Sequence, residues 1–184
     1  MPDLYFISGC NGAGKTTASL TVLPELLDCR EFVNADAIAV GLSPFQPDSV
    51  AFEAGRIMLR RIQTLLASGV TFAIETTLAT KSYANLVVET QRRGYRVTLL
   101  FYWLNSPELA KERVRHRVSE GGHSIPDDVI VRRYQRGIEN FLRIFVPICD
   151  RWYVYDNSMQ LPHLLAKGEM GSLEELKKLP FYNQ

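Results

Sequence analysis

The sequence lacks the features that mark secreted, membrane-bound or nucleic-acid-binding proteins. Its three cysteines are odd in number and have no metal-ligand spacing, so we expect reduced thiols in a cytoplasmic protein. No apolar run approaches the length of a membrane span, and the N-terminus has no signal-peptide pattern. Lys and Arg number 21 against 20 Asp and Glu, so no strong field would attract nucleic acid or an anionic membrane.

Internal repeats, low-complexity tracts and linkers are absent as well. The 184 residues suit one α/β domain that buries a substantial core. We therefore expect a single domain over residues 1–184. Within it, the pattern predicts a helical lid at about 105–146 and a peripheral C-terminal tail at about 168–184.

What the sequence does contain is a loop, GCNGAGKT at residues 9–16, that matches GxxxxGK[ST]. An apolar strand is expected before it and a helix after it, the helix stopping before Pro24. This context predicts a phosphate-binding loop, in which glycines turn backbone N–H groups toward a phosphate and the helix N-terminus adds partial positive charge. Lys15 should reach the outer phosphates of ATP and Thr16 should ligate Mg²⁺. The predicted nucleotide-binding residues are Gly9, Asn11, Gly12, Ala13, Gly14, Lys15, Thr16 and Thr17.

Five apolar segments separated by helical patterns predict the fold. They lie at residues 3–8, 31–34, 70–74, 95–104 and 152–155. Such alternation is typical of a three-layer α/β/α sandwich of the P-loop NTPase or kinase type, with a central parallel sheet of about five strands and, here, a helical lid. Ligands in these sheets bind beyond the carboxyl ends of the strands. Asp36, Glu75 and Asp156 follow strand ends, so we expect them in one crevice with Lys15.

Two of these carboxylates are candidates for chemistry. Asp36 could accept a proton from a hydroxyl that attacks the γ-phosphate, or it could be a helix N-cap or surface turn residue. Glu75 could orient a Mg²⁺-bound water, bind substrate hydroxyls, or be a structural carboxylate. Thr76 and Thr77 add hydroxyl groups at the same rim.

Arginines flank a Gly121-Gly122 break in the predicted lid. Arg113 and Arg117 precede it, and three more follow it: Arg132, Arg133 and Arg136. Cationic groups on a lid would stabilise a transferring phosphoryl group, whereas the alternatives are solvated helix faces or a nucleic-acid patch. The near-zero net charge and the interleaved apolar residues disfavour nucleic acid. We expect His123, inside the break, to be a polar loop residue.

Two other nucleotide-binding classes fit less well. Residues 118–123 faintly resemble the Leu-Ser-Gly-Gly-Gln signature of ABC ATPases, but no strand ending in adjacent acids follows them. The Asn-Lys-x-Asp sequence with which GTPases recognise guanine is absent. The alternative that stays open is a P-loop ATPase or NTP-binding regulatory protein without a small-molecule acceptor.

Four motifs in order resemble those of the zeta-toxin-like P-loop kinases over about residues 3–158. The resemblance is closest to stand-alone bacterial members often labelled as predicted ABC-type ATPases. The motifs are Gly12–Thr17, Asn34–Asp36, Glu75–Thr77 and the lid pattern at residues 121–134. Zeta toxins proper phosphorylate UDP-N-acetylglucosamine on a sugar hydroxyl, using ATP·Mg²⁺, and some pair with a small antitoxin protein. The resemblance therefore implies an ATP-dependent kinase with a hydroxyl acceptor.

The resemblance also implies roles for single residues. Asp36 matches the catalytic base, and Lys15 and Thr16 match the ATP·Mg²⁺ residues. Glu75 and Thr77 match acceptor-binding positions. Arg117 and one of Arg132 and Arg133 match the paired lid arginines, and we favour Arg133. The chain is shorter than the established toxins, which leaves the acceptor and any toxic role open.

Overall fold

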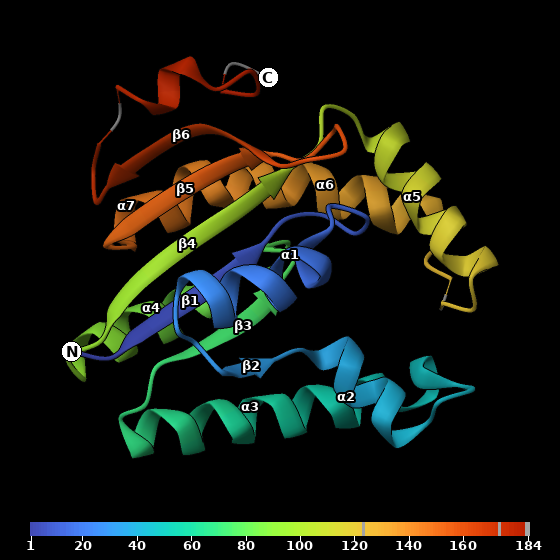
Figure 1. Ribbon diagram of the computed structural model, residues 1–184, viewed down its shortest axis with the longest axis horizontal. Helices are drawn as coiled ribbons and strands as arrows, with labels where there is room; N and C mark the ends of the chain where they lie inside the picture. Colours follow the sequence, from blue (N-terminus) through green and yellow to red (C-terminus); the bar gives the residue numbers. More distant parts are fainter. Residues whose placement is uncertain (123, 173, 183–184) are drawn as a thin grey trace.

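The computed structural model describes residues 1–122, 124–172 and 174–182. Its centre is a six-stranded sheet in the order β2-β3-β1-β4-β5-β6 (Figure 1). Strands β1 to β5 are mutually parallel and β6 runs antiparallel to β5. The strands span Asp3–Ser8, Glu31–Val33, Phe72–Thr76, Arg96–Trp103, Arg151–Asp156 and His163–Glu169 in chain order. The predicted α/β fold with five parallel strands is confirmed, and an antiparallel edge strand is added to it.

Seven α-helices lie between the strands in the part of the chain that the structure describes. They are α1 Lys15–Thr21, α2 Ala35–Leu42, α3 Ala51–Ser68, α4 Tyr83–Arg92, α5 Pro107–Ser119, α6 Asp127–Asn140 and α7 Val146–Ile148. The predicted stop before Pro24 is wrong in detail, because α1 passes into a wider turn over Val22–Leu26. Leu27 N–H bonds there to Val22 O at 3.1 Å, five residues back, which is the spacing of a π-helical turn.

The central strand β1 is buried on both faces. Leu4 and Phe6 belong to the core on the side of α3, α4 and α7, whereas Tyr5 and Ile7 belong to the core on the side of α1 and α5 (Figure 1). Side chains of a strand alternate between faces, so a strand covered on both sides is apolar throughout. The loop that follows β1 therefore starts from a rigid, fully packed element.

The C-terminal region differs from its prediction in two respects, an additional strand and a buried tail. The pattern did not predict β6, because its side chains are largely exposed and only Ala166 is buried. The tail after it was expected to be peripheral, yet Leu176, Leu179 and Phe181 are 4% exposed or less. The Phe181 ring lies 5.3 Å from that of Trp103. The tail thus closes the core at the β5–β6 side of the sheet (Figure 1).

The segment predicted as a lid, 105–146, divides into two parts. Helix α5 and the start of α6 project past the carboxyl ends of the strands (Figure 1), whereas Gly137, Asn140 and Phe141 are buried against the rest of the domain. The projecting part is therefore shorter than the predicted lid of about 105–146, and movement of this part stays a prediction. The Gly-Gly pair ends α5: Gly121 has a φ of 95°, and Gly122 N–H bonds to Arg117 O at 2.9 Å.

Among the residues that the structure covers, no helix combines the length and apolarity that crossing a membrane requires.

Candidate active site

The phosphate-binding loop leaves β1 in a conformation that only glycine adopts readily. Gly9, Gly12 and Gly14 have φ values of 140°, 79° and 76°. A Cβ on Gly14 would lie 2.5 Å from Asn157 Nδ2. That amide donates to Ala13 O at 2.7 Å, so the end of β5 braces the loop. The sequence pattern gave no reason to single out Asn157, because the contact joins segments 144 residues apart.

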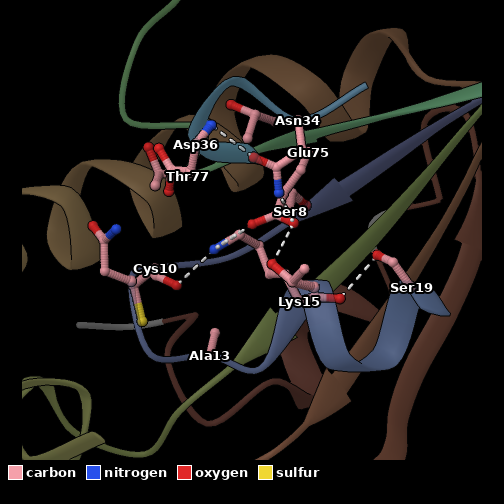
Figure 2. Close-up of polar contacts among 12 residues, drawn as sticks. Ser8, Cys10, Ala13, Lys15, Ser19, Asn34, Asp36, Glu75 and Thr77 are labelled. Carbon is pink, nitrogen blue, oxygen red and sulfur yellow. Dashed lines mark hydrogen bonds and ion pairs between the residues drawn. The ribbon is translucent and has the colours of Figure 1, made fainter. Parts of the chain in front are cut away.

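Lys15 lies inside this loop and is 7% exposed. Its Nζ donates to Cys10 O at 3.0 Å and lies 3.6 Å from Glu75 Oε1, as Figure 2 shows. Both partners are oxygens that an incoming phosphate could replace. The lysine is therefore held where the sequence analysis predicts the outer phosphates of ATP to bind.

Glu75 is the penultimate residue of β3 and lies beside the loop. Its Oε2 accepts hydrogen bonds from Thr16 Oγ1 and Asn34 Nδ2, both at 2.8 Å. The side chain is 11% exposed. Glu75 therefore lies next to Thr16 and Lys15, the residues predicted to bind Mg²⁺ and the phosphates. Among the roles expected for Glu75, this position suits an interaction with Mg²⁺ better than one with substrate hydroxyls alone.

Asp36 lies in the first turn of α2, a helix that the sequence analysis did not predict. The helix cap is Asn34, whose Oδ1 accepts from the N–H of Asp36 at 2.8 Å and of Ala37 at 3.2 Å. The alternative that Asp36 is an N-cap is therefore wrong. Within the described ranges its exposed carboxylate makes no hydrogen bond or ion pair. It is available to a ligand.

Three chambers meet at Asp36. The phosphate chamber, about 290 Å³, follows the loop and reaches Arg113 and Arg117 on α5. The polar chamber, about 220 Å³, is lined by Glu75, Thr77 and Arg133 among others. The open chamber, about 840 Å³, lies between the α2–α3 connection and the end of α5, with Phe45 and Arg117 in its lining. Asp36 thus lines the predicted nucleotide site and two neighbouring chambers at once.

The predicted arginines have different surroundings. Arg133 Nη1 donates to Asn11 Oδ1 at 3.1 Å, so this arginine reaches the phosphate loop. Arg132 is exposed, with Asp128 at 3.8 Å, and Arg136 is exposed too. Arg113 donates to the carbonyls of Asn157 and Ser158 at 2.8 and 3.1 Å, which makes it a brace. His123 lies outside the described residues.

Thr77 is presented to the polar chamber by a strained turn. Leu78 is fully buried with a φ of 54°, a value that is unfavourable for a residue with a branched side chain. Asn140 Nδ2 donates to Leu78 O at 2.6 Å, and a Cβ on Gly137 would lie 2.8 Å from Thr77 O. Helix α6, which carries Arg133, therefore holds this turn in place.

Comparison with known proteins adds the family. A model described as an AAA domain matches residues 4–140. The chain belongs to the AAA domain family. An uncharacterized protein of Haemophilus influenzae is 27% identical to this AAA domain chain over 129 residues, which cover 70% of the chain and 90% of that protein.

Solved structures share the fold of this AAA domain. A chain from the PezAT chromosomal toxin–antitoxin system of Streptococcus pneumoniae aligns with a TM-score of 0.70 at 20% identity, covering 91% of this chain and 71% of that one. The AvrRxo1-ORF1:-ORF2 structure with ATP aligns at 0.74 and 17% identity, covering 100% of this chain and 65% of that one. This chain thus spans 65% of the latter's length. The predicted resemblance to zeta-toxin-like P-loop kinases is confirmed as a likeness of fold.

The residues of the AAA domain site fit a Mg²⁺ ion bound together with phosphates. Thr16 and Glu75 offer hard oxygen atoms next to Lys15, and Mg²⁺ is usually held by one or two protein oxygens plus substrate phosphates. No group of three His, Cys, Asp or Glu side chains within the described ranges forms a dedicated metal cage. The donor set therefore suits a metal that arrives with the nucleotide.

Gly14→Ala should weaken ATP binding by about tenfold or more, since the new Cβ meets the bracing Asn157 amide and the positive φ is itself costly. Gly55→Ala in α3 is the matched control. A Cβ there meets nothing within 4 Å, so the helix should tolerate or favour it. Titration with a fluorescent ATP analogue measures both. Equal affinity of the two variants would contradict the braced loop.

The three thiols should be unreactive in the folded protein. Burial raises the pKa of the Cys10 thiol to about 11 and that of Cys29 to about 11, and it raises the pKa of Cys149 further. At pH 7 only about one Cys10 in ten thousand would then be the reactive thiolate. Iodoacetamide should label native protein slowly at all three positions and denatured protein fast. Rapid native labelling of Cys10 would show an exposed loop instead.

Proposed function

We propose that this chain is a small-molecule kinase that transfers the γ-phosphate of ATP to a hydroxyl group of an acceptor. The observation that carries the proposal is the position of Asp36, where the phosphate chamber meets two further chambers. Within the described ranges its carboxylate makes no hydrogen bond or ion pair. A nucleotide-binding regulator needs only the phosphate chamber, and an ATPase also needs a group that orients water, but neither needs an open chamber of about 840 Å³ beside that group. This distinction favours a kinase over the ATPase alternative.

In the proposed reaction, Asp36 accepts the proton of the acceptor hydroxyl while the hydroxyl oxygen attacks the γ-phosphorus and the bond to ADP breaks. Lys15 leaves Cys10 O and Glu75 to bind the outer phosphates. Arg133 and Arg117 stabilise the charge on the transferring group. Mg²⁺, held by Thr16 with Glu75 beside it, would neutralise charge on the phosphate oxygens.

The acceptor class that we favour is a nucleotide sugar such as UDP-N-acetylglucosamine. The open chamber, about 840 Å³, has the size for such a ligand. Its lining includes Phe45, which is 97% exposed, between Pro44 and Gln46. An aromatic ring left in water is well suited to stack on a base, and Arg117 in the same lining suits a diphosphate. Thr77 would then meet the sugar hydroxyls through the polar chamber.

We also propose a small antitoxin as a protein partner, and a cytoplasmic location. Support for the partner comes from the fold shared with a chain of the PezAT toxin–antitoxin system. A neighbouring reading frame that encodes a small inhibitor would be its genetic counterpart. Co-expression should then relieve any growth defect that this chain causes, and unchanged growth with and without the small protein would contradict the partnership.

The kinase proposal is tested with purified protein, γ-labelled ATP and Mg²⁺, against a panel of nucleotide sugars and hydroxylated metabolites. The expected result is labelled product from at least one acceptor and faster ADP release in its presence. No transfer to any acceptor, together with ATP hydrolysis only when a protein partner is added, would replace the kinase with the ATPase alternative.

A further inference from the structure

Asn34 lies where strand β2 stops pairing with β3. The last residue pair between these strands is Val33 with Ile74, so Asn34 and Glu75 occupy the next position on each. Strand β2 has only three residues and forms the edge of the sheet. Beyond Val33, backbone pairing no longer holds this segment to its neighbour. Beyond this point a side-chain contact between Asn34 and Glu75 holds the two segments together.

This contact uses both ends of the Asn34 amide. Oδ1 accepts from the N–H groups of Asp36 and Ala37, and Nδ2 donates to Glu75 Oε2 at 2.8 Å. The same carboxylate oxygen accepts from Thr16 Oγ1. Asn34 is 7% exposed, so water competes little for these bonds. A chain of hydrogen bonds, buried at Asn34 and exposed at Thr16, therefore runs from the first turn of α2 to the phosphate loop; Figure 2 shows Asn34, Asp36 and Glu75 within it.

We propose that Asn34 is a positioning residue, which fixes the distance between Asp36 and the cluster of Glu75, Thr16 and Lys15. The inference rests on the proposed function, because it assigns Asp36 to the attacking hydroxyl and Glu75 to the metal and phosphate end. A general base acts only within hydrogen-bond reach of its proton, and a displacement of about 1 Å can cost about 100-fold in rate. One amide sets the position of both groups.

Few side chains can replace this amide. Serine caps helices as well as asparagine does, but its hydroxyl is too short to cap α2 and also reach Glu75. Aspartate also caps, but its carboxylate has no proton to donate and would face a second negative charge. These two substitutions keep the cap of α2 and remove the hydrogen bond to Glu75, so they separate the two roles of Asn34.

The experiment compares Asn34→Ser and Asn34→Asp with Asn85→Asp, the same chemical change at an exposed position on α4. Both Asn34 variants keep the cap, so Asn34→Ser should melt close to the wild-type temperature, whereas Asn34→Asp should melt lower because it places a second negative charge against Glu75. Asn34→Ser should lower kcat about 10- to 100-fold and raise the KM for ATP by a smaller factor. Asn34→Asp should lower kcat at least as much, because its carboxylate has no proton to donate to Glu75. Asn85→Asp should match the wild type in melting temperature and in kcat.

A wild-type kcat for either Asn34 variant would overturn the proposal. A second measurement does not depend on activity: the gain in affinity for a non-hydrolysable ATP analogue on adding Mg²⁺. It should be smaller in Asn34→Ser, since Glu75 loses one of its two donors, and an unchanged gain would also overturn the proposal. Failure of phosphate transfer in the wild type would reject the proposed function, and this binding measurement would still decide the role of Asn34.

Discussion

The Asp36→Asn variant should bind ATP as the wild type does and transfer phosphate about 10²–10⁴-fold more slowly, the usual contribution of a general base. The change removes the proton acceptor and preserves the shape of the side chain. Binding should be unaffected because, within the described part of the chain, the carboxylate makes no hydrogen bond or ion pair with the phosphate loop. Single-turnover transfer to the acceptor and equilibrium binding of an ATP analogue measure the two quantities separately.

Asp128→Asn is the control for this substitution, since Asp128 lies in the first turn of α6 and its side chain is 75% exposed. Its turnover should equal that of the wild type. Asp36→Asn with normal turnover would remove the base assignment and leave the phosphate loop untouched. Loss of ATP binding in Asp36→Asn would show instead that the carboxylate shapes the nucleotide site.

The parts of the site that could be predicted from the sequence are those encoded within a few consecutive residues. The glycines of the phosphate loop, Lys15 and Thr16 form a local pattern whose flanking strand and helix were also recognisable. Asp36 and Glu75 could be placed in one crevice because the carboxyl ends of parallel strands meet at one edge of a sheet. These predictions needed only the element order.

The contacts that support those residues could not be predicted, because they join distant segments. Asn157 meets Ala13 across 144 residues, and Asn140 meets Leu78 across 62. The N-cap role of Asn34 was missed because the short helix α2 follows a three-residue strand and carries little periodic signal. Strand β6 was missed since an exposed edge strand lacks the apolar run of a central strand.

The sequence could not decide which arginine of α6 faces the phosphate loop, because that choice depends on packing. Arg132 and Arg133 are adjacent, so they point about 100° apart around α6, and either could face the loop. The side on which α6 packs decides between them, and that side is defined by Ile130, Tyr134 and Gly137. The contact of Arg133 with Asn11 gives the geometric basis for the choice that the resemblance left open.

Arg133→Ala should lower kcat about 10²–10³-fold, which is the usual effect of removing one donor that stabilises transition-state charge. The KM for ATP should rise only modestly, because the loop keeps its brace from Asn157 and its lysine. Arg133→Lys should recover part of the loss, since it keeps the charge but lacks the planar fork of donors. Steady-state kinetics with varied ATP and acceptor separate kcat from the two KM values.

Arg132→Ala is the adjacent control. Its side chain is 52% exposed and its nearest acidic partner, Asp128, lies 3.8 Å away on the surface, an arrangement that contributes little to stability or catalysis. Turnover of this variant should stay close to wild type. Equal losses in the two variants would mean that general positive charge on α6 matters rather than one placed guanidinium. A larger loss for Arg132→Ala would mean that α6 rotates or shifts when substrates bind, and that the contact between Arg133 and Asn11 belongs to the ligand-free state alone.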